Sequence, residues 1–521
     1  MPKTIRLLRT EGNYFLVEPT TTVVGKILSK EFTYEHRFQV RGQGSGRRRG
    51  SPVQVESIEC FDLDHQGRMV LAYGFIQRAA AVLRRKGYKV DYIDRPPTKH
   101  ELKVYDPNFD NVFRQAELRH RQDEFLCKVV ANHVARFDCA PGYGKSFLIG
   151  LIAIMFPYAK ICVVSRRIQV LRDRIYPELL GIIPDVGIKG GGKNVSGRRV
   201  MCYTSGSVQH ALAQKWDVVI VDECHEAASD DTAYKLAMFD GRPRMYGLSG
   251  SQDMRWDGKD MRCEGLFGPI VMKVGYQEGV ANKMLVPLTV HWRDVIIDVD
   301  PCGDHQDTFK KRWGLWQNDY RNDIIAADCQ RHPGEQVIVT CESVEHCVQL
   351  KRRVPQATLV YAVNGMERPN KFDPSGPTRR QTFLEKGWIT EDEPLMTAHR
   401  LQGLLKDLQA GLPGIFICTG VINVGVDLKH CLAVCRAEGT GSAIMDTQVP
   451  GRVSRVDGKK TAGHVYDYRD QFNRGLAGNA KSRSKNYAQH GWTQEFPEED
   501  AALKLLVARQ NETSHRMRRR A

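Results

Sequence analysis

Short apolar runs separated by longer stretches with helical patterning constrain the fold of this chain more than any other feature. One series comprises HVARFDCA, KICVVSR, RRVMCYTS, DVVIVDE and RMYGLSG, and a second comprises LTVHWRDVIIDV, EQVIVTC, ATLVYAV, GIFICTG and LAVCRAE. Continuous apolar strands alternating with helices are typical of a parallel sheet covered on both faces. The sequence therefore predicts two α/β domains in tandem, joined near residues 285–287.

The chain of 521 residues is too long for a single hydrophobic core, so further parts are expected around these two domains. The expected division is a smaller α+β domain at 1–112, α/β domains at 113–284 and 285–475, and a basic helical tail at 476–521. The segment RPPTKH at 95–100 is the expected linker, because paired prolines stiffen the chain and block a helix.

Charge and composition narrow the class of partner. The 76 Lys and Arg residues outnumber the 61 Asp and Glu residues, which gives a net charge of +15. This excess favours a polyanionic partner, although a solvated basic surface would give the same number. The longest apolar run, FLIGLIAIMF, reaches about half of the roughly 20 residues needed to cross a bilayer. No membrane association and a cytoplasmic location are expected, with the 14 scattered cysteines reduced and mostly buried.

The stretch DCAPGYGKSFLI nearly matches the phosphate-binding loop GxxxxGK[ST], with Cys139 at the place of the first glycine. An apolar strand precedes it and an apolar helix follows, as a phosphate cradle requires. Gly142 and Gly144 let the backbone approach phosphate oxygens, Lys145 can reach the β- and γ-phosphates, and Ser146 can hold Mg²⁺. A glycine turn before a helix would give a similar pattern, so the motif needs a second element.

The segment WDVVIVDECHEAA supplies that element. Its apolar strand ends at Asp222 and Glu223, and catalytic groups of open α/β sheets lie at such strand ends. Asp222 suits a partner of Mg²⁺, and Glu223 suits a base that orients or activates the attacking water. The alternative is an acidic surface turn.

The two segments together resemble motifs I and II of superfamily 2 helicases and translocases, of the DEAD/DEAH-like kind. Other segments resemble the remaining motifs of that family in order: LRHRQDE the glutamine motif, VVSRRIQVL motif Ia, CYTSGS motif Ic, GLSGS motif III, CTGVINVGVDL motif V and QVPGRVSR motif VI. The resemblance covers residues 113–475 and implies two RecA-like domains, ATP and Mg²⁺ as cofactors, and a nucleic-acid partner. GLSGS lacks the family's Ala-Thr, which puts the details of coupling in question, and Cys139 occupies a position that tolerates small residues.

The resemblance also implies a role for individual residues. The expected catalytic residues are Lys145, Asp222, Glu223, Gln448, Arg452 and Arg455, with Ser146 and Asp222 at the metal. The expected nucleotide contacts are Gln122, Arg119, Ala140, Pro141, Gly142, Tyr143, Gly144, Lys145, Ser146, Gly425 and Asp427. The expected nucleic-acid contacts are Arg166, Arg167, Thr204, Ser207 and Thr419, and the expected coupling residues are His225, Ser249 and Ser251. For the Ser and Thr residues of the nucleic-acid set, capping of strand ends is an equal alternative.

Arg452 and Arg455 have a role that follows from their place in the chain. They lie three residues apart, on one face if the segment is helical, and belong to the second α/β domain. An arginine supplied across a domain interface can stabilise the charge that develops on the γ-phosphate. Hydrolysis would then depend on closure between the two domains.

Further segments resemble the UvsW/XPB-like branch, in particular GLSGSQDMRWDGKDMRCEGLFGPIVMKVGYQEGVANKMLVPL and VYDYRDQF. That branch acts on DNA, including forks and junctions, and includes phage-encoded members, whose N-terminal accessory domain resembles residues 70–97 here. The sequence thus predicts an ATP-dependent DNA helicase or branch-migrating translocase, in the host cytoplasm if phage-encoded, with an accessory DNA-binding domain and a basic loop at Arg47, Arg48 and Arg49. A duplex translocase that remodels protein–DNA complexes without unwinding, an RNA helicase and a non-catalytic nucleic-acid scaffold are the alternatives.

Overall fold

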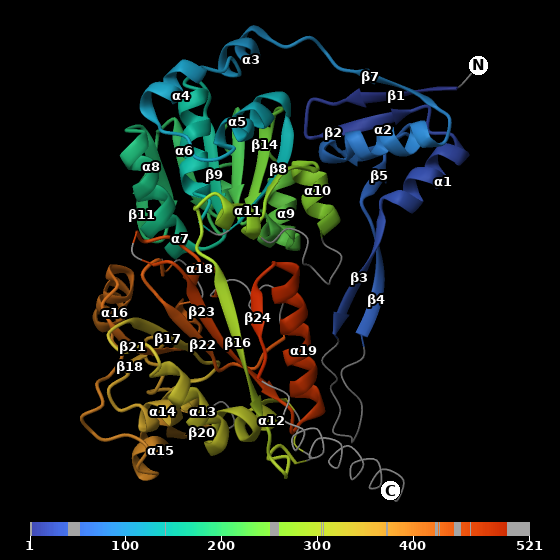
Figure 1. Ribbon diagram of the computed structural model, residues 1–521. Helices are drawn as coiled ribbons and strands as arrows, with labels where there is room; N and C mark the ends of the chain where they lie inside the picture. Colours follow the sequence, from blue (N-terminus) through green and yellow to red (C-terminus); the bar gives the residue numbers. More distant parts are fainter. Residues whose placement is uncertain are drawn as a thin grey trace, which may run out of the picture. The chain divides into compact units, whose positions relative to one another are not determined.

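Figure 1 shows the computed structural model, which describes residues 3–39, 53–140, 142–250, 260–303, 305, 307–370, 373–422, 426, 428–441, 450–458 and 460–497. The chain forms two compact units, Met1–Gly275 and Tyr276–Ala521. The first unit holds an N-terminal sheet and the first RecA-like sheet, and the second unit holds the second RecA-like sheet. The predicted α/β class with two parallel sheets and a smaller N-terminal sheet is therefore confirmed.

The N-terminal sheet is five-stranded, in the order β5-β6-β2-β1-β7. The bounds are β1 (Thr4–Arg9), β2 (Tyr14–Glu18), β5 (Phe61–Leu63), β6 (Met69–Ala72) and β7 (Lys89–Ile93), with helices α1 (Thr22–Glu31), η1 (Tyr73–Phe75) and α2 (Ile76–Arg85). Leu7, Phe15, Leu28 and Leu83 form part of the core between helices and sheet. A separate two-stranded ribbon joins β3 (Thr33–Gln39) to β4 (Val53–Glu59). The strand–helix–strand order predicted from MVLAYGF onward is that of β6, α2 and β7.

The first RecA-like sheet is eight-stranded, in the order β11-β10-β12-β9-β13-β14-β8-β15. Its strands are β8 (Val134–Cys139), β9 (Ile161–Ser165), β10 (Val186–Gly190), β11 (Lys193–Val195), β12 (Val200–Thr204), β13 (Val218–Asp222), β14 (Arg244–Ser249) and β15 (Ile270–Val274). All neighbouring strands are parallel except the β10–β11 hairpin. Each of the five apolar runs predicted for this domain forms a strand.

Helices cover both faces of this sheet, which explains why its strands are apolar throughout (Figure 1). They include α3 (Lys99–Val104), α4 (Phe109–Gln115), α5 (Gln122–Ala131), α6 (Lys145–Met155), α8 (Tyr176–Ile182), α9 (Asp230–Ala237) and α10 (Asp260–Phe267). On one face, Cys162 and Val164 of β9 share a core cluster with Phe267 of α10. None of the cysteines that the structure describes forms a disulfide, and all but Cys60 and Cys127 are buried.

The N-terminal sheet packs on α10 of the first RecA-like domain. Gly74 lies so close to α10 that a Cβ on it would stand 2.0 Å from the carbonyl oxygen of Glu264, so only glycine fits there. Arg78 forms an ion pair with Glu264 at 3.0 Å, and Arg242 forms one with Asp94 at 2.5 Å. Apolar packing and charge pairing therefore join these two parts of the first unit.

The second RecA-like sheet is seven-stranded, in the order β18-β21-β17-β22-β23-β16-β24, and its neighbouring strands are parallel. The strands are β16 (Leu288–Val295), β17 (Gln336–Thr340), β18 (Thr358–Val360), β21 (Gly414–Cys418), β22 (Ala433–Arg436), β23 (Gly463–Asp470) and β24 (Thr493–Glu495). The principal helices are α13 (Asp319–Cys329), α14 (Val344–Arg353), α16 (Ala398–Ala410) and α19 (Arg474–Gln489). Because β24 pairs with β16, the second sheet continues past residue 475, where the sequence placed the start of a tail. Within the described ranges, no helix is both long and apolar enough to span a membrane.

Candidate nucleotide-binding site

The carboxyl ends of five strands of the first RecA-like sheet are aligned. In the strand register, Ser249 of β14 is opposite Asp138 of β8, and Asp222 of β13 is opposite both Leu248 and Ser165. Thr204 of β12 is opposite Ser165 on the other side of β9. The segments that follow these strands therefore leave the sheet at one edge, where open α/β sheets bind ligands.

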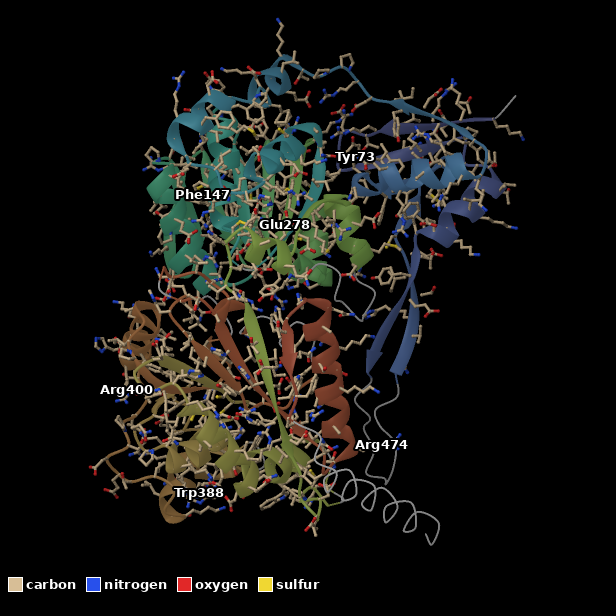
Figure 2. All side chains as sticks on the ribbon, viewed as in Figure 1. Tyr73, Phe147, Glu278, Trp388, Arg400 and Arg474 are labelled. Atoms are coloured by element: carbon tan, nitrogen blue, oxygen red, sulfur yellow. The ribbon has the colours of Figure 1, made fainter. Side chains whose placement is uncertain are left out.

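The predicted phosphate loop connects β8 to α6. Gly142 and Gly144 have φ values of 92° and 89°, a left-handed backbone conformation that residues with a Cβ rarely adopt. Lys145 is the first residue of α6, and Phe147, labelled in Figure 2, follows Ser146 in the same turn. The amide groups of this helix start and the preceding glycines form the kind of positive concavity that binds phosphate.

Cys139 ends β8 inside the sheet and not in the loop. Its side chain is fully buried, and burial raises the pKa of its thiol to about 12. The thiol therefore stays protonated and acts as a small apolar group at neutral pH. The replacement of the first glycine by Cys139 therefore lies outside the part of the loop that needs glycine, which is Gly142 and Gly144.

Gln122 and Tyr143 hold the phosphate loop from behind. The hydroxyl of Tyr143 donates a hydrogen bond to the carbonyl oxygen of His120 at 2.8 Å. The Gln122 side chain accepts from the amide of Arg119 at 2.9 Å and donates to the carbonyl oxygen of Tyr143 at 3.4 Å. Gln122 is fully buried. Its amide thus connects the glutamine motif with the loop, while adenine contacts by Gln122 and Arg119 stay a prediction.

Lys145 and Glu223 meet at the centre of the site. Lys145 Nζ lies 3.1 Å from Glu223 Oε1. Glu223 directly follows β13 and has a φ of 50°, a left-handed conformation that is uncommon outside glycine. Burial alone would raise the pKa of Glu223, but Lys145 and then His225 outweigh it and lower that pKa to about 2. Glu223 is therefore ionised at neutral pH.

Two side chains form a hydrogen-bonded chain behind Glu223. Ser249 Oγ donates to Glu223 Oε2 at 3.1 Å, and His225 Nδ1 lies 2.7 Å from Ser249 Oγ. A hydroxyl carries one hydrogen, so Ser249 must accept from the protonated Nδ1 of His225. Ser249 and His225 are both buried. The end of β14 and the acidic motif are thus connected, as the predicted coupling role requires, and Ser251 lies outside the described residues.

Ser146 and Asp222 provide oxygen ligands suited to Mg²⁺. Both are buried at the strand ends, and burial followed by the Glu223 charge raises the pKa of Asp222 to about 6. A carboxylate and a hydroxyl are hard oxygen donors, and Mg²⁺ commonly uses one or two protein oxygens together with phosphates and water. The structure describes no cluster of three or more His, Cys, Asp or Glu residues able to hold a metal by itself. The donor set therefore fits a metal that arrives with a nucleotide.

The predicted nucleic-acid contacts of the first unit have different environments. Arg166 is exposed, whereas Arg167 is held by Glu226 through contacts of 2.5 Å from Nη2 and 3.1 Å from Nε to the same oxygen. Thr204 and Ser207 bond each other at the end of β12, with 3.0 Å between their hydroxyl oxygens. Their capping role is thus present, and contact with a phosphate stays a prediction for all four residues.

Glu226 is a site residue that sequence reasoning missed. It lies three residues after Glu223 and is only 8% exposed, and its carboxylate binds Arg167. The amide of Glu226 also donates to the carbonyl oxygen of Glu223 at 2.8 Å. The one signal in the sequence was a further acidic residue directly after DECH; its partner Arg167 is identified only by the sheet, in which β13 neighbours β9.

The second unit carries the remaining predicted residues that the structure describes. Arg452 belongs to α18 (Pro450–Val453), and its Nη1 donates to the carbonyl oxygen of Ile422 at 2.6 Å. Arg455 follows the end of that helix and pairs with Leu285 in an isolated β-bridge. Arg452 and Arg455 therefore do not lie on one face of a helix, the arrangement expected only if the segment were helical. Thr419 follows β21, and its amide donates to the carbonyl oxygen of Val360. The predicted residues Pro141, Gly425, Asp427 and Gln448, and the basic loop at Arg47, Arg48 and Arg49, lie outside the described residues.

Comparisons with known proteins agree with this architecture. No family model matches the chain. A protein assigned as helicase 22 of Sulfolobus islandicus filamentous virus (isolate Iceland/Hveragerdi) is 22% identical over 266 residues, which is 49% of this chain and 43% of the viral protein. Among solved structures, T4 UvsW is 16% identical and covers 95% of this chain and 99% of its own, with a TM-score of 0.37.

A second solved structure is similar to this chain in fold. It is a fragment assigned as an HsdR subunit of a type I restriction enzyme from Vibrio vulnificus YJ016, with 15% identity, a TM-score of 0.51, and coverage of 91% of this chain and 96% of its own. An identity this low speaks to architecture alone. Together with the two RecA-like sheets, the likeness leads to one conclusion: the chain shares the fold of this fragment, and its motifs resemble, in their order, those of superfamily 2 helicases.

Proposed function

We propose that the chain is an ATP-driven DNA helicase or translocase that unwinds or branch-migrates forks and junctions. The observation that carries the proposal is the meeting of Lys145 and Glu223, 3.1 Å apart, at the carboxyl edge of the first RecA-like sheet. A phosphate-loop lysine and an ionised carboxylate at this edge are the parts that hydrolysis of a nucleoside triphosphate needs. The UvsW-like segments of the sequence favour DNA as the track.

In the proposed mechanism, the loop amides and Lys145 bind the β- and γ-phosphates. Lys145 then exchanges its contact with Glu223 for one with phosphate oxygens, because the Glu223 carboxylate and the phosphate compete for the one ammonium group of Lys145. Glu223, relieved of Lys145 but still bonded to Ser249, can accept a proton from water or orient it. Mg²⁺, held by Ser146 and Asp222, would neutralise charge on the phosphates when bound.

The remaining predicted roles complete the proposal. Residues 1–112 would serve as an accessory DNA-binding domain, residues 113–284 and 285–475 as the two motor domains, and 476–521 as a basic tail. Arg452 and Arg455 would complete the ATP site from the second unit, with Gln448, Gly425 and Asp427 as further contributors. Arg166, Arg167, Thr204, Ser207 and Thr419 would contact the nucleic-acid backbone without reading sequence.

The test is an ATPase and strand-separation assay across single strands, blunt duplexes, forks, four-way junctions and RNA. DNA-stimulated hydrolysis is expected, lost in Lys145→Ala and lowered about 10²- to 10⁴-fold in Glu223→Gln, since the amide cannot act as a base. The matched control is Lys215→Ala, which removes an 84% exposed lysine from a surface ion pair of the same unit and should leave turnover unchanged.

Two results would contradict the proposal. Hydrolysis stimulated by RNA and not by DNA would refute the choice of track. Turnover that survives in Lys145→Ala or Glu223→Gln at the wild-type rate would refute the assigned ATP site and with it the motor.

A further inference from the structure

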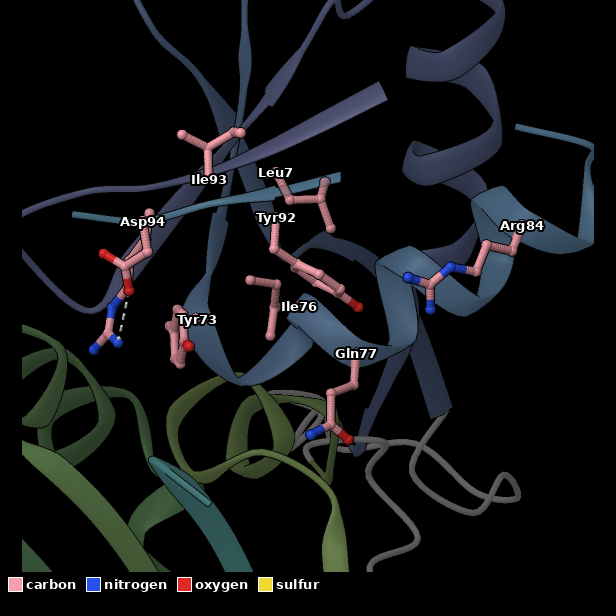
Figure 3. A pocket seen from close by; sticks show the side chains of 9 residues that line it. Leu7, Tyr73, Ile76, Gln77, Arg84, Tyr92, Ile93 and Asp94 are labelled. Atoms are coloured by element: carbon pink, nitrogen blue, oxygen red, sulfur yellow. Dashed lines mark hydrogen bonds and ion pairs between the residues drawn. The ribbon is translucent and has the colours of Figure 1, made fainter. Parts of the chain in front are cut away.

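A pocket of about 570 Å³ opens on the N-terminal sheet, far in sequence from the motor motifs (Figure 3). The end of β1, the start of α2 and the end of β7 enclose it. It is lined by Leu7, Arg9, Tyr73, Ile76, Gln77, Arg84, Tyr92, Ile93 and Asp94. Its volume falls within the range of small-ligand sites, and its lining combines apolar side chains with a few polar groups, as such sites do.

The back wall of the pocket is fixed. The Arg9 guanidinium lies 4.1 Å from the centre of the Tyr73 ring and 3.4 Å from the Asp94 carboxylate. Arg9 also contacts His133, the residue before β8, and Asp94 is held by Arg242 at 2.5 Å. Leu7 beneath it is fully buried. This wall is therefore preorganised, and a ligand need not order it.

The outer wall carries groups with no such partners. Tyr92, on the edge strand β7, is 49% exposed, and the Arg84 guanidinium lies 5.5 Å from the centre of its ring. Among the residues that the structure describes, the Arg84 guanidinium forms no ion pair and the Gln77 side chain forms no hydrogen bond. An exposed cation–π contact is weak, so another ring can take the place of Arg84 against Tyr92 at little cost.

The surroundings of the pocket are basic. Arg84 and Arg85 end α2, and Lys86 follows as its C-cap, all three exposed. Positive groups beside an exposed aromatic ring are the combination that binds single-stranded nucleic acids: a base stacks on the ring and phosphates bind the cations. An acidic peptide would use the cations but would leave the exposed ring of Tyr92 without a function.

We propose that this pocket binds an unpaired base of a DNA strand, stacked on Tyr92, with Arg84 on an adjoining phosphate. The base enters between Tyr92 and the wall formed by Tyr73 and Ile76, and displaces the Arg84 guanidinium towards the backbone. Gln77 supplies an amide to the edge of the base. The inference rests on the proposed function for the identity of its partner, and it gives the N-terminal sheet a preference for single strands and forks over blunt duplex.

The test measures binding of labelled single-stranded, forked and blunt duplex DNA to the full chain without nucleotide. Tyr92→Ala should bind the single strand and the fork roughly 5- to 100-fold more weakly, because stacking on one aromatic ring is lost, and should bind blunt duplex as the wild type does. Tyr92→Phe should retain the wild-type affinity. Arg84→Ala should weaken binding and lower the slope of log K against log salt by about 0.7, whereas Tyr92→Ala leaves that slope unchanged.

The matched control is Tyr158→Ala, which removes a 62% exposed tyrosine whose ring lies 4.9 Å from the Lys103 ammonium. It offers the same chemistry outside this pocket and should bind every DNA as the wild type does. Wild-type affinity of Tyr92→Ala for the single strand, or an equal loss on blunt duplex, would overturn the pocket. Either result, with normal DNA-stimulated ATPase in the same variant, refutes the pocket alone, whereas a wild-type chain without DNA binding refutes the proposed function as well.

Discussion

Arg167 and Glu226 show how single residues connect the acidic motif with the expected nucleic-acid face. Arg167 follows β9 and Glu226 follows the acidic motif after β13, and these strands are neighbours in the sheet. The Nε and Nη2 groups of Arg167 both bind the carboxylate of Glu226. A phosphate can therefore use Arg167 only after it displaces Glu226, whose amide is in turn bonded to the carbonyl of Glu223. If Arg167 binds nucleic acid as proposed, this ion pair links that binding to the proposed catalytic carboxylate of Glu223.

A substitution at Glu226 tests this competition. Glu226→Gln removes the charge that holds Arg167, so binding of single-stranded DNA in the absence of nucleotide should strengthen by about 3- to 10-fold. Arg167→Ala should weaken binding, and the double variant should behave as Arg167→Ala does, because the effect of Glu226 passes through Arg167. Fluorescence anisotropy titrations measure all three. Unchanged or weaker binding by Glu226→Gln would show that Arg167 has no part in binding.

At the scale of helices and strands, the predicted strands follow from one pattern, because a strand covered on both faces must be apolar throughout. The apolar pattern did not predict β24, because its three residues Thr493–Glu495 include no apolar residue and pair with β16 at the edge of the sheet. The β3–β4 ribbon escaped it too, because a two-stranded ribbon has no buried face to impose a long apolar run.

The parts of the site that the sequence predicts are local, and the parts that it does not predict are contacts between distant segments. The phosphate loop and the acidic motif are local, since each is a strand end and its following residues. The bonds from Tyr143 to His120 and from Arg167 to Glu226 join segments that only the order of strands brings together. Strand order depends on pairing between distant segments, which a single sequence does not display.

Tyr143→Phe tests the anchor between the glutamine motif and the phosphate loop. The change leaves the ring but removes the hydroxyl that donates to the carbonyl of His120 at 2.8 Å. Loss of one buried hydrogen bond should lower the free energy of unfolding by about 1 kcal/mol. Because the anchor positions the loop and touches no reacting atom, KM for ATP should rise more than kcat falls. Urea denaturation and steady-state ATPase kinetics measure the two effects, with exposed Tyr158→Phe as the control. A stability and a KM equal to those of the wild type would remove Tyr143 from this role.

At the scale of the whole molecule, each unit has its own sheet and core, so each can respond separately to solvent conditions. The second unit has a cluster of histidines at one end of its sheet. His291 and His464 lie on β16 and β23, and their ring nitrogens are 3.0 Å apart. His332 stacks on His464, and His291 also binds Glu495 of β24 at 2.8 Å. Burial, and for His332 and His464 the neighbouring histidines, lower the pKa of all three.

Acid should therefore destabilise the second unit through this cluster. The unfolded chain takes up these protons near the ordinary histidine pKa of about 6.5, and the folded chain takes them up only at lower pH. The stability is thus complete above that value and is lost as pH falls towards the lowered values. His464→Gln should narrow the difference in Tm between about pH 7.5 and about pH 5.5, as scanning calorimetry can measure. A difference as large as in the wild type would show that the cluster does not cause the loss.

The proposed motor belongs to this scale, because the phosphate loop lies in the first unit and Arg452 and Arg455 lie in the second. If an arginine of the second unit stabilises the γ-phosphate in the transition state, Arg455→Ala should lower kcat by about 10³- to 10⁵-fold and leave ATP affinity nearly unchanged. Phosphate release and titration with a fluorescent nucleotide separate these quantities. Arg474→Ala, at the exposed start of α19 in the same unit, is the matched control and should match the wild type in both. Equal losses of kcat and ATP affinity would assign Arg455 to ground-state binding, and unchanged kinetics would leave hydrolysis to the first unit alone.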